Sequence, residues 1–123
     1  PEDSMTKALR TALGAALLSM GIGCGPRDPG ERVYVRKCAG CHGPAGASTS
    51  SYRARFPHAD LTDGVWRHGS DLASMRRLIA EGDPKSPMPR FEGRLDPEEI
   101  DAVARYVERL VRTSGEARRP KER

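Results

Sequence analysis

The 123-residue chain has few of the side chains that normally build a protein core. Aromatic residues make up 5% of it, with a single Trp, whereas 31% of the residues are charged. A chain of this length forms one domain at most, and a small domain buries only a modest share of its surface. The composition therefore excludes a large core built by the polypeptide alone. It leaves room for a large apolar prosthetic group without requiring one.

The sequence also shows no alternation of apolar and polar residues over strand lengths, and no internal repeat. Aromatic side chains are not interleaved with the basic ones, so a nucleic-acid surface is not indicated. The formal net charge is +4, and much of it falls in residues 112–123, because five basic side chains there outweigh two acidic ones. We interpret residues 112–123 as a solvated, disordered tail, which leaves the folded body close to neutral.

Long apolar runs are scarce, and the one near the start of the chain is too short to span a membrane comfortably. Lys7 and Arg10 precede this run, which ends at Ile22, and a basic region followed by an apolar region is typical of an export signal. We therefore expect residues 1–23 to be a signal peptide, with residues 1–4 as an upstream extension. The mature protein would then reach the periplasm.

An odd number of cysteines in an exported protein needs an explanation, and Cys24 offers one. It follows the apolar run and a small residue, an arrangement similar to the lipidation site of bacterial lipoproteins, although Gly21 stands where those proteins usually have leucine. A lipid on Cys24 would anchor the protein to the membrane through a short linker, residues 24–29. Cleavage nearby by the ordinary signal peptidase and an uncleaved anchor are the alternatives.

Three segments of the mature chain show the apolar period of helices. They are approximately residues 31–43, 70–82 and 97–111. Asp28 and Asp96 are expected to cap the first and the third helix, and each is followed by a proline suited to the first turn. Ser70 is expected to cap the second helix and Gly82 to end it.

The connections between these segments are long. Residues 45–63 hold no convincing period and are expected to form a loop with short turns. Residues 83–93 contain three prolines, which exclude a helix and predict an extended loop. The expected fold class is therefore all-α, a small domain with three main helices and long loops.

The stretch KCAGCHG, residues 37–43, carries the densest chemistry. Thiols at positions i and i+3 lie on one face of a helix, so Cys38 and Cys41 can both reach the vinyl groups along one side of a porphyrin. His42 then projects its imidazole toward the iron from the same helix. This spacing is that of c-type haem attachment. Such attachment takes place after export, in agreement with a signal peptide.

Two other chemistries use paired cysteines. A thioredoxin-like dithiol needs its CxxC motif after a strand in an α/β unit, and no strand pattern precedes Cys38. A structural zinc site needs four ligands in a tetrahedron, and Cys41 and His42 diverge too far, as neighbours on a helix, to share one ion easily. We therefore favour one covalently bound haem as the cofactor over a redox dithiol and over zinc.

A haem iron also needs a ligand on its second face, and Met88 is the leading candidate. Two prolines flank it, and they reduce the entropy that the loop would lose on ligation. Thioether sulfur is a soft donor, and His/Met ligation raises the haem potential. Met75 belongs to an apolar helix stripe and is expected in the core. His58 and His68 remain alternatives that would give a bis-histidine site.

With these features the chain resembles the class I cytochromes c, a family of small electron carriers, over residues 30–111. Gly30 and Tyr34 are similar to the glycine and the aromatic residue on the family's first helix. Val103 and Tyr106 are similar to the apolar and aromatic residues on its last helix. The resemblance implies that the two helices cross closely at the glycine. It also implies that the helices and loops wrap one covalently attached haem.

Further stretches carry the resemblance. MPRF, residues 88–91, looks like the family's axial methionine loop. DLTDGVWRHGS and RLDPEEIDAVARYVERL look like the single-haem subunits and domains associated with respiratory oxidases and dehydrogenases. The family commonly has a proline whose carbonyl receives the axial histidine's N–H. Here Ala59 stands at that place and Pro57 two residues earlier, so the acceptor for His42 stays open. Trp66 is a candidate haem contact.

The resemblance implies an electron carrier rather than an enzyme. The leading interpretation is a membrane-tethered periplasmic cytochrome that passes single electrons between redox proteins, a dehydrogenase or a terminal oxidase, and binds no small-molecule substrate. The alternative is an electron-transfer subunit fixed in a respiratory dehydrogenase or oxidase complex. A haem peroxidase or gas sensor is a third class. It needs an open iron position, which a methionine held between prolines disfavours.

Overall fold

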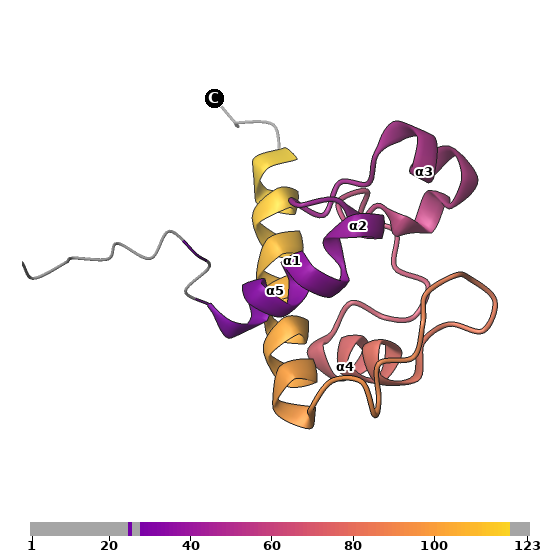
Figure 1. Cartoon of the computed structure of the whole chain (residues 1–123). Helices are drawn as coiled ribbons and strands as arrows, with labels where there is room; N and C mark the ends of the chain where they lie inside the picture. The colour runs from indigo at the N-terminus through magenta and orange to yellow at the C-terminus, as the bar shows by residue number, and fades with distance from the viewer. Residues whose placement is uncertain (1–24, 26–27, 119–123) are drawn as a thin grey trace, which may run out of the picture.

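The computed structural model describes Gly25 and residues 28–118 (Figure 1). The signal peptide expected over residues 1–23 and the expected lipidation site at Cys24 lie outside the described residues. The end of the chain, residues 119–123, does so as well. Within the described part the fold is all-α, without a strand.

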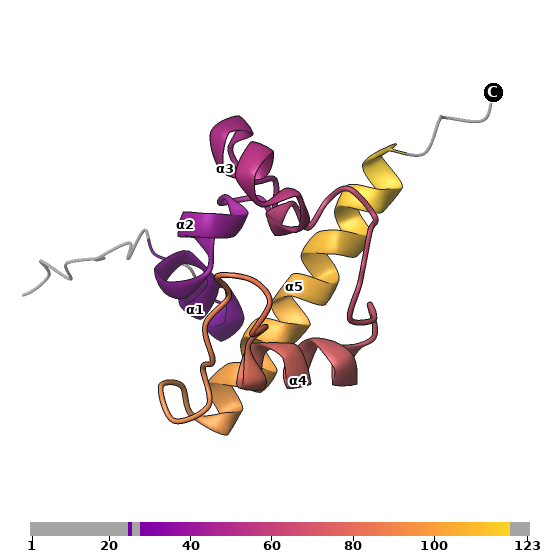
Figure 2. The same ribbon diagram turned by 90° about the vertical axis from the view of Figure 1, so that its right-hand side faces the viewer.

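Helix α5, Pro97–Arg118, is the longest helix of the described residues, and the other two long helices contact it. Helix α1, Pro29–Lys37, crosses it, and helix α4, Leu72–Glu81, packs against it, as both ribbon views show (Figures 1 and 2). These helices lie in the three segments for which the sequence predicts helices. The arrangement leaves the segment between α1 and α4 to form the remaining wall of the domain.

Three shorter elements occupy that segment. They are α2, Ala39–His42; α3, Ser50–Arg55; and the 3-10 turn η1, Pro57–Ala59. The expected first helix is therefore broken at Cys38, and the haem-attachment motif forms a turn of its own. The prediction of a loop is wrong for residues 50–55. A helix of six residues is too short to show an apolar period, and Thr49 starts it by accepting the N–H of Tyr52 at 3.4 Å.

Acidic caps start α1 and α4, the two longer helices that precede α5. Oδ1 of Asp28 accepts the N–H of Gly30 at 2.7 Å, as expected for α1. In α4 the predicted cap, Ser70, is one residue early: Asp71 takes this role and accepts the N–H of Ser74 at 2.9 Å. The carboxylate carries the negative charge that a helix N-terminus favours.

Helix α5 begins with a contact typical of a capping box, in which Oε2 of Glu99 accepts the N–H of Asp96 at 3.1 Å. It continues through Arg118, so the prediction of a disordered tail is wrong for residues 112–118. That prediction weighed only the charge of the segment. Arg, Glu and Ala are good helix formers, and a helix already nucleated on a core extends at little cost.

The crossing of α1 over α5 depends on Gly30. A Cβ at this position would lie 2.1 Å from the carbonyl oxygen of Ala102 on α5. The close approach brings the rings of Tyr34 and Tyr106 to 5.2 Å between centroids. Tyr34 is fully buried and its hydroxyl donates to the carbonyl of Gly43 at 2.7 Å, which ties α1 to the end of α2. The helix crossing implied by the resemblance is confirmed.

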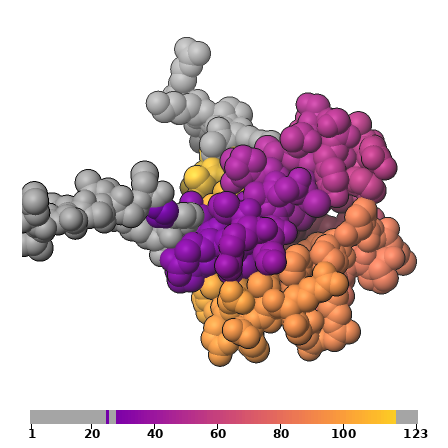
Figure 3. Space-filling model, viewed as in Figure 1, coloured from indigo at the N-terminus to yellow at the C-terminus, as the bar shows by residue number. Residues whose placement is uncertain are grey.

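One apolar core joins α1, α4, α5 and the loop between the last two. Its buried members are Val33, Tyr34, Met75, Ile79, Phe91, Leu95, Ile100, Val103, Ala104 and Val107. Met75 is thus a core residue, as expected. On the face seen in Figure 3, α1 (indigo) lies beside the orange segment that leads into α5. An ion pair joins α1 to the first turn of α5, with Nη2 of Arg36 3.4 Å from Oε1 of Glu99.

Candidate haem site

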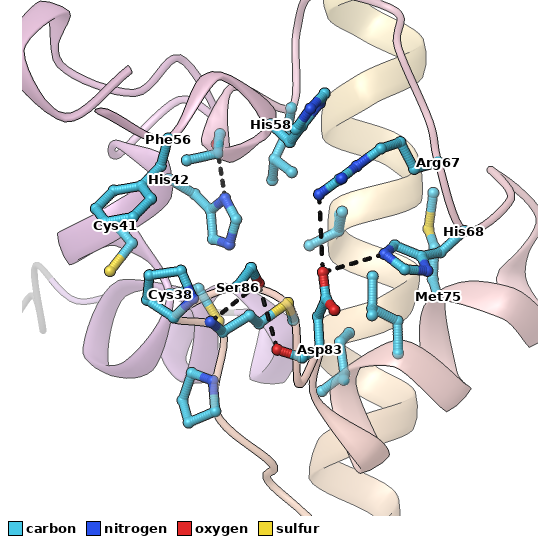
Figure 4. A pocket seen from close by; sticks show the side chains of 18 of the residues that line it. Cys38, Cys41, His42, Phe56, His58, Arg67, His68, Met75, Asp83 and Ser86 are labelled. Carbon is cyan, nitrogen blue, oxygen red and sulfur yellow. Dashed lines mark hydrogen bonds and ion pairs between the residues drawn. The ribbon is translucent and has the colours of Figure 1, made fainter. Parts of the chain in front are cut away.

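A cavity of about 360 Å³ opens beside the core (Figure 4). This volume lies in the range of sites for small organic ligands and cofactors. Four of the residues predicted to bind haem line the cavity together: Cys38, Cys41, His42 and Met88. Trp66 lines it too and packs partly buried against the core. The apolar part of the wall includes Leu61, Met75, Leu78, Ile79, Phe91 and Val107.

The CxxCH motif lies at the junction of α1 and α2. The N–H groups of Cys41 and His42 both donate to the carbonyl of Cys38, at 3.1 and 3.0 Å. One helical turn therefore carries both cysteines and the histidine. Gly43 ends this turn at a φ of 77°, where a Cβ would lie 2.0 Å from the carbonyl oxygen of Ala47. The sharp exit from the motif thus requires glycine.

The imidazole of His42 is oriented by one backbone group. Its Nδ1 lies 2.7 Å from the carbonyl oxygen of Ala59, at the end of η1. A carbonyl oxygen only accepts, so Nδ1 carries the proton and Nε2 keeps its lone pair, turned toward the cavity (Figure 4). Burial lowers the pKa of His42, and the bond to Ala59 opposes this only in part, which favours the neutral imidazole that binds metals. Ala59 is therefore the acceptor that the sequence left open.

The two thiols do not have the character of a redox pair. Cys38 is partly buried and Cys41 is exposed. Burial, and then the neighbouring Cys41, raises the pKa of Cys38 to about 11, whereas reactive dithiols have lowered pKa values. Within the part of the chain that the structure describes, no three His, Cys, Asp or Glu side chains are placed to share a metal ion. Two thiols beside an apolar cavity and an available imidazole nitrogen instead fit a haem held by thioethers.

Met88 reaches the cavity from the loop that follows α4. Its N–H donates to Oγ of Ser86 at 3.3 Å, and its carbonyl accepts the N–H of Asp83 at 3.2 Å. The loop turns back on α4 at Gly82, whose φ is 73° and whose Cβ would meet the backbone nitrogen of Arg90 at 2.7 Å. These bonds bring the methionine to the cavity that also receives His42.

The alternative histidine ligands also line the cavity, with different surroundings. Nε2 of His68 lies 3.3 Å from Oδ2 of Asp83 and is therefore engaged in a polar contact. His58, the residue after Pro57, is exposed.

Asp83 is the residue of this site that the sequence reasoning missed. Its side chain is 7% exposed and lines the cavity. The N–H of Lys85, at 2.9 Å from Oδ1, lowers the pKa of Asp83; burial raises it; and contacts with Ser86 and His68 bring it below its ordinary value. An Asp-Pro pair opening a loop is a signal for such a turn. The burial of the carboxylate has no comparable signal.

Basic side chains predominate among the charged residues of the cavity. They are Lys37, Arg55, Arg67 and Lys85. Asp83 is the one acidic residue among the described residues that line it. Val65, which is 57% exposed, adds an apolar surface at the same place. The cavity therefore has a mostly cationic lip.

Residues 25–107 match the family model described as "Cytochrome C oxidase, cbb3-type, subunit III". The chain is 41% identical over 81 residues to the Cbb3-type cytochrome c oxidase subunit FixP of Bradyrhizobium diazoefficiens, covering 66% of this chain and 26% of the relative. It is 39% identical over 82 residues to the subunit CcoP of Rubrivivax gelatinosus, covering 67% and 25%. It is also 37% identical over 104 residues to cytochrome c4 of Thiocapsa roseopersicina, covering 70% and 50%.

The chain spans about a quarter of the length of the oxidase subunits that it matches. None of the helices in the described part combines the length and the apolar character needed to cross a membrane. Residues 25–107, which match the family model, thus correspond to only part of those subunits.

Proposed function

Because the chain belongs to the family described as cytochrome c oxidase, cbb3-type, subunit III, we propose that it is the electron-transfer domain of a respiratory oxidase complex. It is an all-α class I cytochrome c with covalently bound haem c. The observation that carries the proposal is the convergence of the CxxCH turn and Met88 on one apolar cavity. The haem, when bound, supplies a one-electron couple between ferrous and ferric iron.

In this proposal Cys38 and Cys41 hold the haem through thioether bonds. His42 would bind the iron through Nε2, with its Nδ1 proton held by Ala59. Met88 would supply the second protein ligand.

The remaining residues of the cavity exclude water and hold the ligands in place. Tyr34 anchors α1 to the end of the motif turn through Gly43, and Trp66 closes part of the wall as a haem contact. An apolar environment and His/Met ligation both act on the reduction potential. No side chain of the site is assigned to a chemical step on a substrate.

Attachment to the membrane through a lipid on Cys24, in the periplasm, is part of the proposal and rests on the order of residues that precede Cys24. Asp28, four residues further on, forms an ion pair with Arg109 of α5. A tether at Cys24 would therefore join the domain where α1 crosses α5.

A membrane-tethered periplasmic carrier that belongs to no complex is the second candidate. The similarity to cytochrome c4 favours it, because that match extends over half of the relative. The two candidates differ in assembly. Membranes of the native host, solubilised and separated by native electrophoresis, should carry the haem-stained chain in the same band as oxidase activity if it is a fixed domain. A haem band at the size of the single chain would support the carrier that belongs to no complex.

The ligand set is tested by visible spectra of the full chain made in a host with cytochrome c maturation machinery. We expect sharp low-spin bands on reduction with dithionite and a weak red band of methionine-ligated ferric haem. Met88→Ala should abolish the red band and lower the potential. Met75→Leu, a core methionine at the same cavity, is the matched control and should keep both. A red band that survives in Met88→Ala would move the axial ligand away from Met88, and a haem-free product would overturn the whole assignment.

A further inference from the structure

A buried carboxylate faces the proposed haem cavity without a part in haem ligation. Oδ1 of Asp83 accepts the N–H of Lys85 at 2.9 Å. Oδ2 faces two side chains from a different loop, Nε2 of His68 at 3.3 Å and Nη2 of Arg67 at 3.8 Å (Figure 4). The carboxylate thus bridges the loop after α4 and the loop before it.

The backbone of Asp83 shapes the loop that carries Met88. Its N–H donates to the carbonyl of Met88 at 3.2 Å, and its carbonyl accepts the N–H of Ser86 at 3.0 Å. Oγ of Ser86 in turn accepts the N–H of Met88 at 3.3 Å. The loop from Asp83 to Met88 is therefore closed on itself, and its first residue is the one that contacts the facing loop.

Burial of this carboxylate is costly unless partners compensate for it. The side chains of Arg67 and His68 are 46% and 44% exposed, so water could satisfy them without Asp83. Asp83 has no such alternative, since its side chain is 7% exposed. The arrangement restricts the loop of Asp83 far more than it restricts its two partners.

We propose that Asp83 is a positioning residue for Met88, because its contacts with Arg67 and His68 clasp the methionine loop against the facing loop and keep the sulfur on the iron. The inference rests on the proposed ligation by Met88. Loss of the clasp leaves the fold in place but increases the fraction of molecules in which the sulfur has left the iron. Such molecules bind an external ligand.

Imidazole is the probe, because it binds ferric iron only where the sixth position opens. The haem-loaded full chain is titrated with imidazole and followed by the main visible absorption band of the haem, which shifts on imidazole binding whether or not a methionine was bound before. Asp83→Asn keeps the shape of the side chain and an acceptor for Lys85 but loses the charge that faces Arg67 and His68. We expect imidazole to bind about tenfold more tightly, the change that follows from losing one charge-assisted hydrogen bond.

Asp71→Asn is the matched control. Asp71 is also a loop carboxylate that accepts an N–H and a hydroxyl, both from Ser74, but it does not line the cavity. Its affinity for imidazole should stay within about twofold of wild type, whatever the change in unfolding midpoint. An Asp83→Asn variant with a lower unfolding midpoint but wild-type imidazole affinity would make Asp83 a purely structural residue and overturn the proposal.

A double variant, Arg67→Gln with His68→Gln, tests the same clasp from exposed positions that tolerate substitution. It should also tighten imidazole binding, and wild-type affinity in this variant would again overturn the proposal. The imidazole affinities of wild type and Met88→Ala are measured first. Equal imidazole affinity in these two would refute ligation by Met88, the proposed function, whereas a large difference between them combined with no effect at Asp83 would refute the clasp alone.

Discussion

The orientation of His42, the proposed iron ligand, depends on a backbone carbonyl, and a buried carboxylate next to that carbonyl helps to hold it in place. Ala59 offers its carbonyl to His42 as any residue at that position could, provided that the segment is held in place. The next residue, Asp60, is 4% exposed and accepts the N–H and the hydroxyl of Thr62, at 2.8 and 2.6 Å. Nη1 of Arg53 donates to its other oxygen at 2.8 Å. Asp60 therefore fixes the backbone that orients the histidine.

This anchoring predicts a loss of stability in acid. Burial raises the pKa of Asp60, but the hydrogen bonds from Thr62 and Arg53 outweigh it and hold the pKa below its ordinary value of about 3.9. The stabilisation is therefore complete above the unfolded pKa, and it disappears as the pH falls through the folded pKa. In urea titrations between pH 6 and pH 2, Asp60→Asn should lose less unfolding free energy in acid than wild type does.

At neutral pH the same Asp60→Asn variant should be about 1–3 kcal/mol less stable than wild type. The buried asparagine would still face the donors of Thr62 and Arg53, but without the negative charge that strengthens those hydrogen bonds. Arg53→Gln is the companion variant. It removes one exposed donor and leaves the carboxylate, so it should cost at most about 1 kcal/mol and keep part of the acid dependence. Parallel pH profiles for wild type and Asp60→Asn would show that Asp60 does not link stability to pH.

At the residue scale, the sequence predicts those site residues whose positions follow from their spacing along the chain. Cys38, Cys41 and His42 share one turn because they are adjacent in the motif, and the structure brings them to one cavity with Met88. Asp83 could not be found in this way. Its partners Arg67 and His68 come from a loop fifteen or more positions away, and nothing local distinguishes a buried aspartate at a turn from an exposed one.

At the scale of elements, the crossing of α1 and α5 makes a specific prediction for Gly30. Alanine is the better helix former by about 1 kcal/mol. The added Cβ, however, would lie 2.1 Å from a carbonyl oxygen of α5, a backbone atom that cannot turn aside. We expect Gly30→Ala to lower the unfolding free energy by about 1–3 kcal/mol, the usual range for an overpacked core. Denaturant titration of the haem-loaded protein measures it.

Gly115→Ala is the matched control on α5, because no atom lies within 4 Å of its Cβ position. There the helix propensity acts alone, and the variant should gain up to about 1 kcal/mol. If both substitutions stabilise the protein, α1 and α5 are not in tight contact at Gly30.

The long helices were predictable because their apolar periods and caps agree, as the capping-box contact at the start of α5 illustrates. The short α3 was not. Its six residues give no period, and the packing of Tyr52 on Phe56, at 4.9 Å between ring centroids, is visible only in the folded chain. The break at Cys38 likewise has no signal in composition. The sequence analysis predicts too short a third helix, because the charge of residues 112–118 suggests disorder although the same residues favour helix.

For the whole molecule, the distribution of charge matters more than its total of +4. Basic residues line the cavity, whereas Arg36, Arg76, Arg90 and Arg109 pair with acidic residues elsewhere. An acidic redox partner would therefore meet an attractive field at the haem site. Fields of this kind act on association rates and weaken as salt is added.

Two small oxidants of opposite charge test this field without a protein partner. Ferricyanide is an anion, and tris(phenanthroline)cobalt(III) is a cation. The second-order rate constant for oxidation of the ferrous protein by ferricyanide should fall as ionic strength rises, and Lys85→Glu should lower it several-fold at low salt. The cobalt complex should show the opposite effect of Lys85→Glu. Stopped-flow spectroscopy of the haem bands follows both reactions.

Arg112→Glu, near the C-terminal end of α5, changes the net charge by the same amount away from the lip of the cavity. If the local field governs the approach of the oxidant, Arg112→Glu should leave both rate constants close to wild type. Equal effects of Lys85→Glu and Arg112→Glu would mean that only the net charge is felt, and the cationic lip would then have no part in guiding a partner. A larger effect at Lys85 than at Arg112 with both oxidants would indicate that electrons leave at the cavity lined by Lys85, His42 and Met88. A charge changes the rate constant most when it lies close to the point at which the oxidant receives the electron.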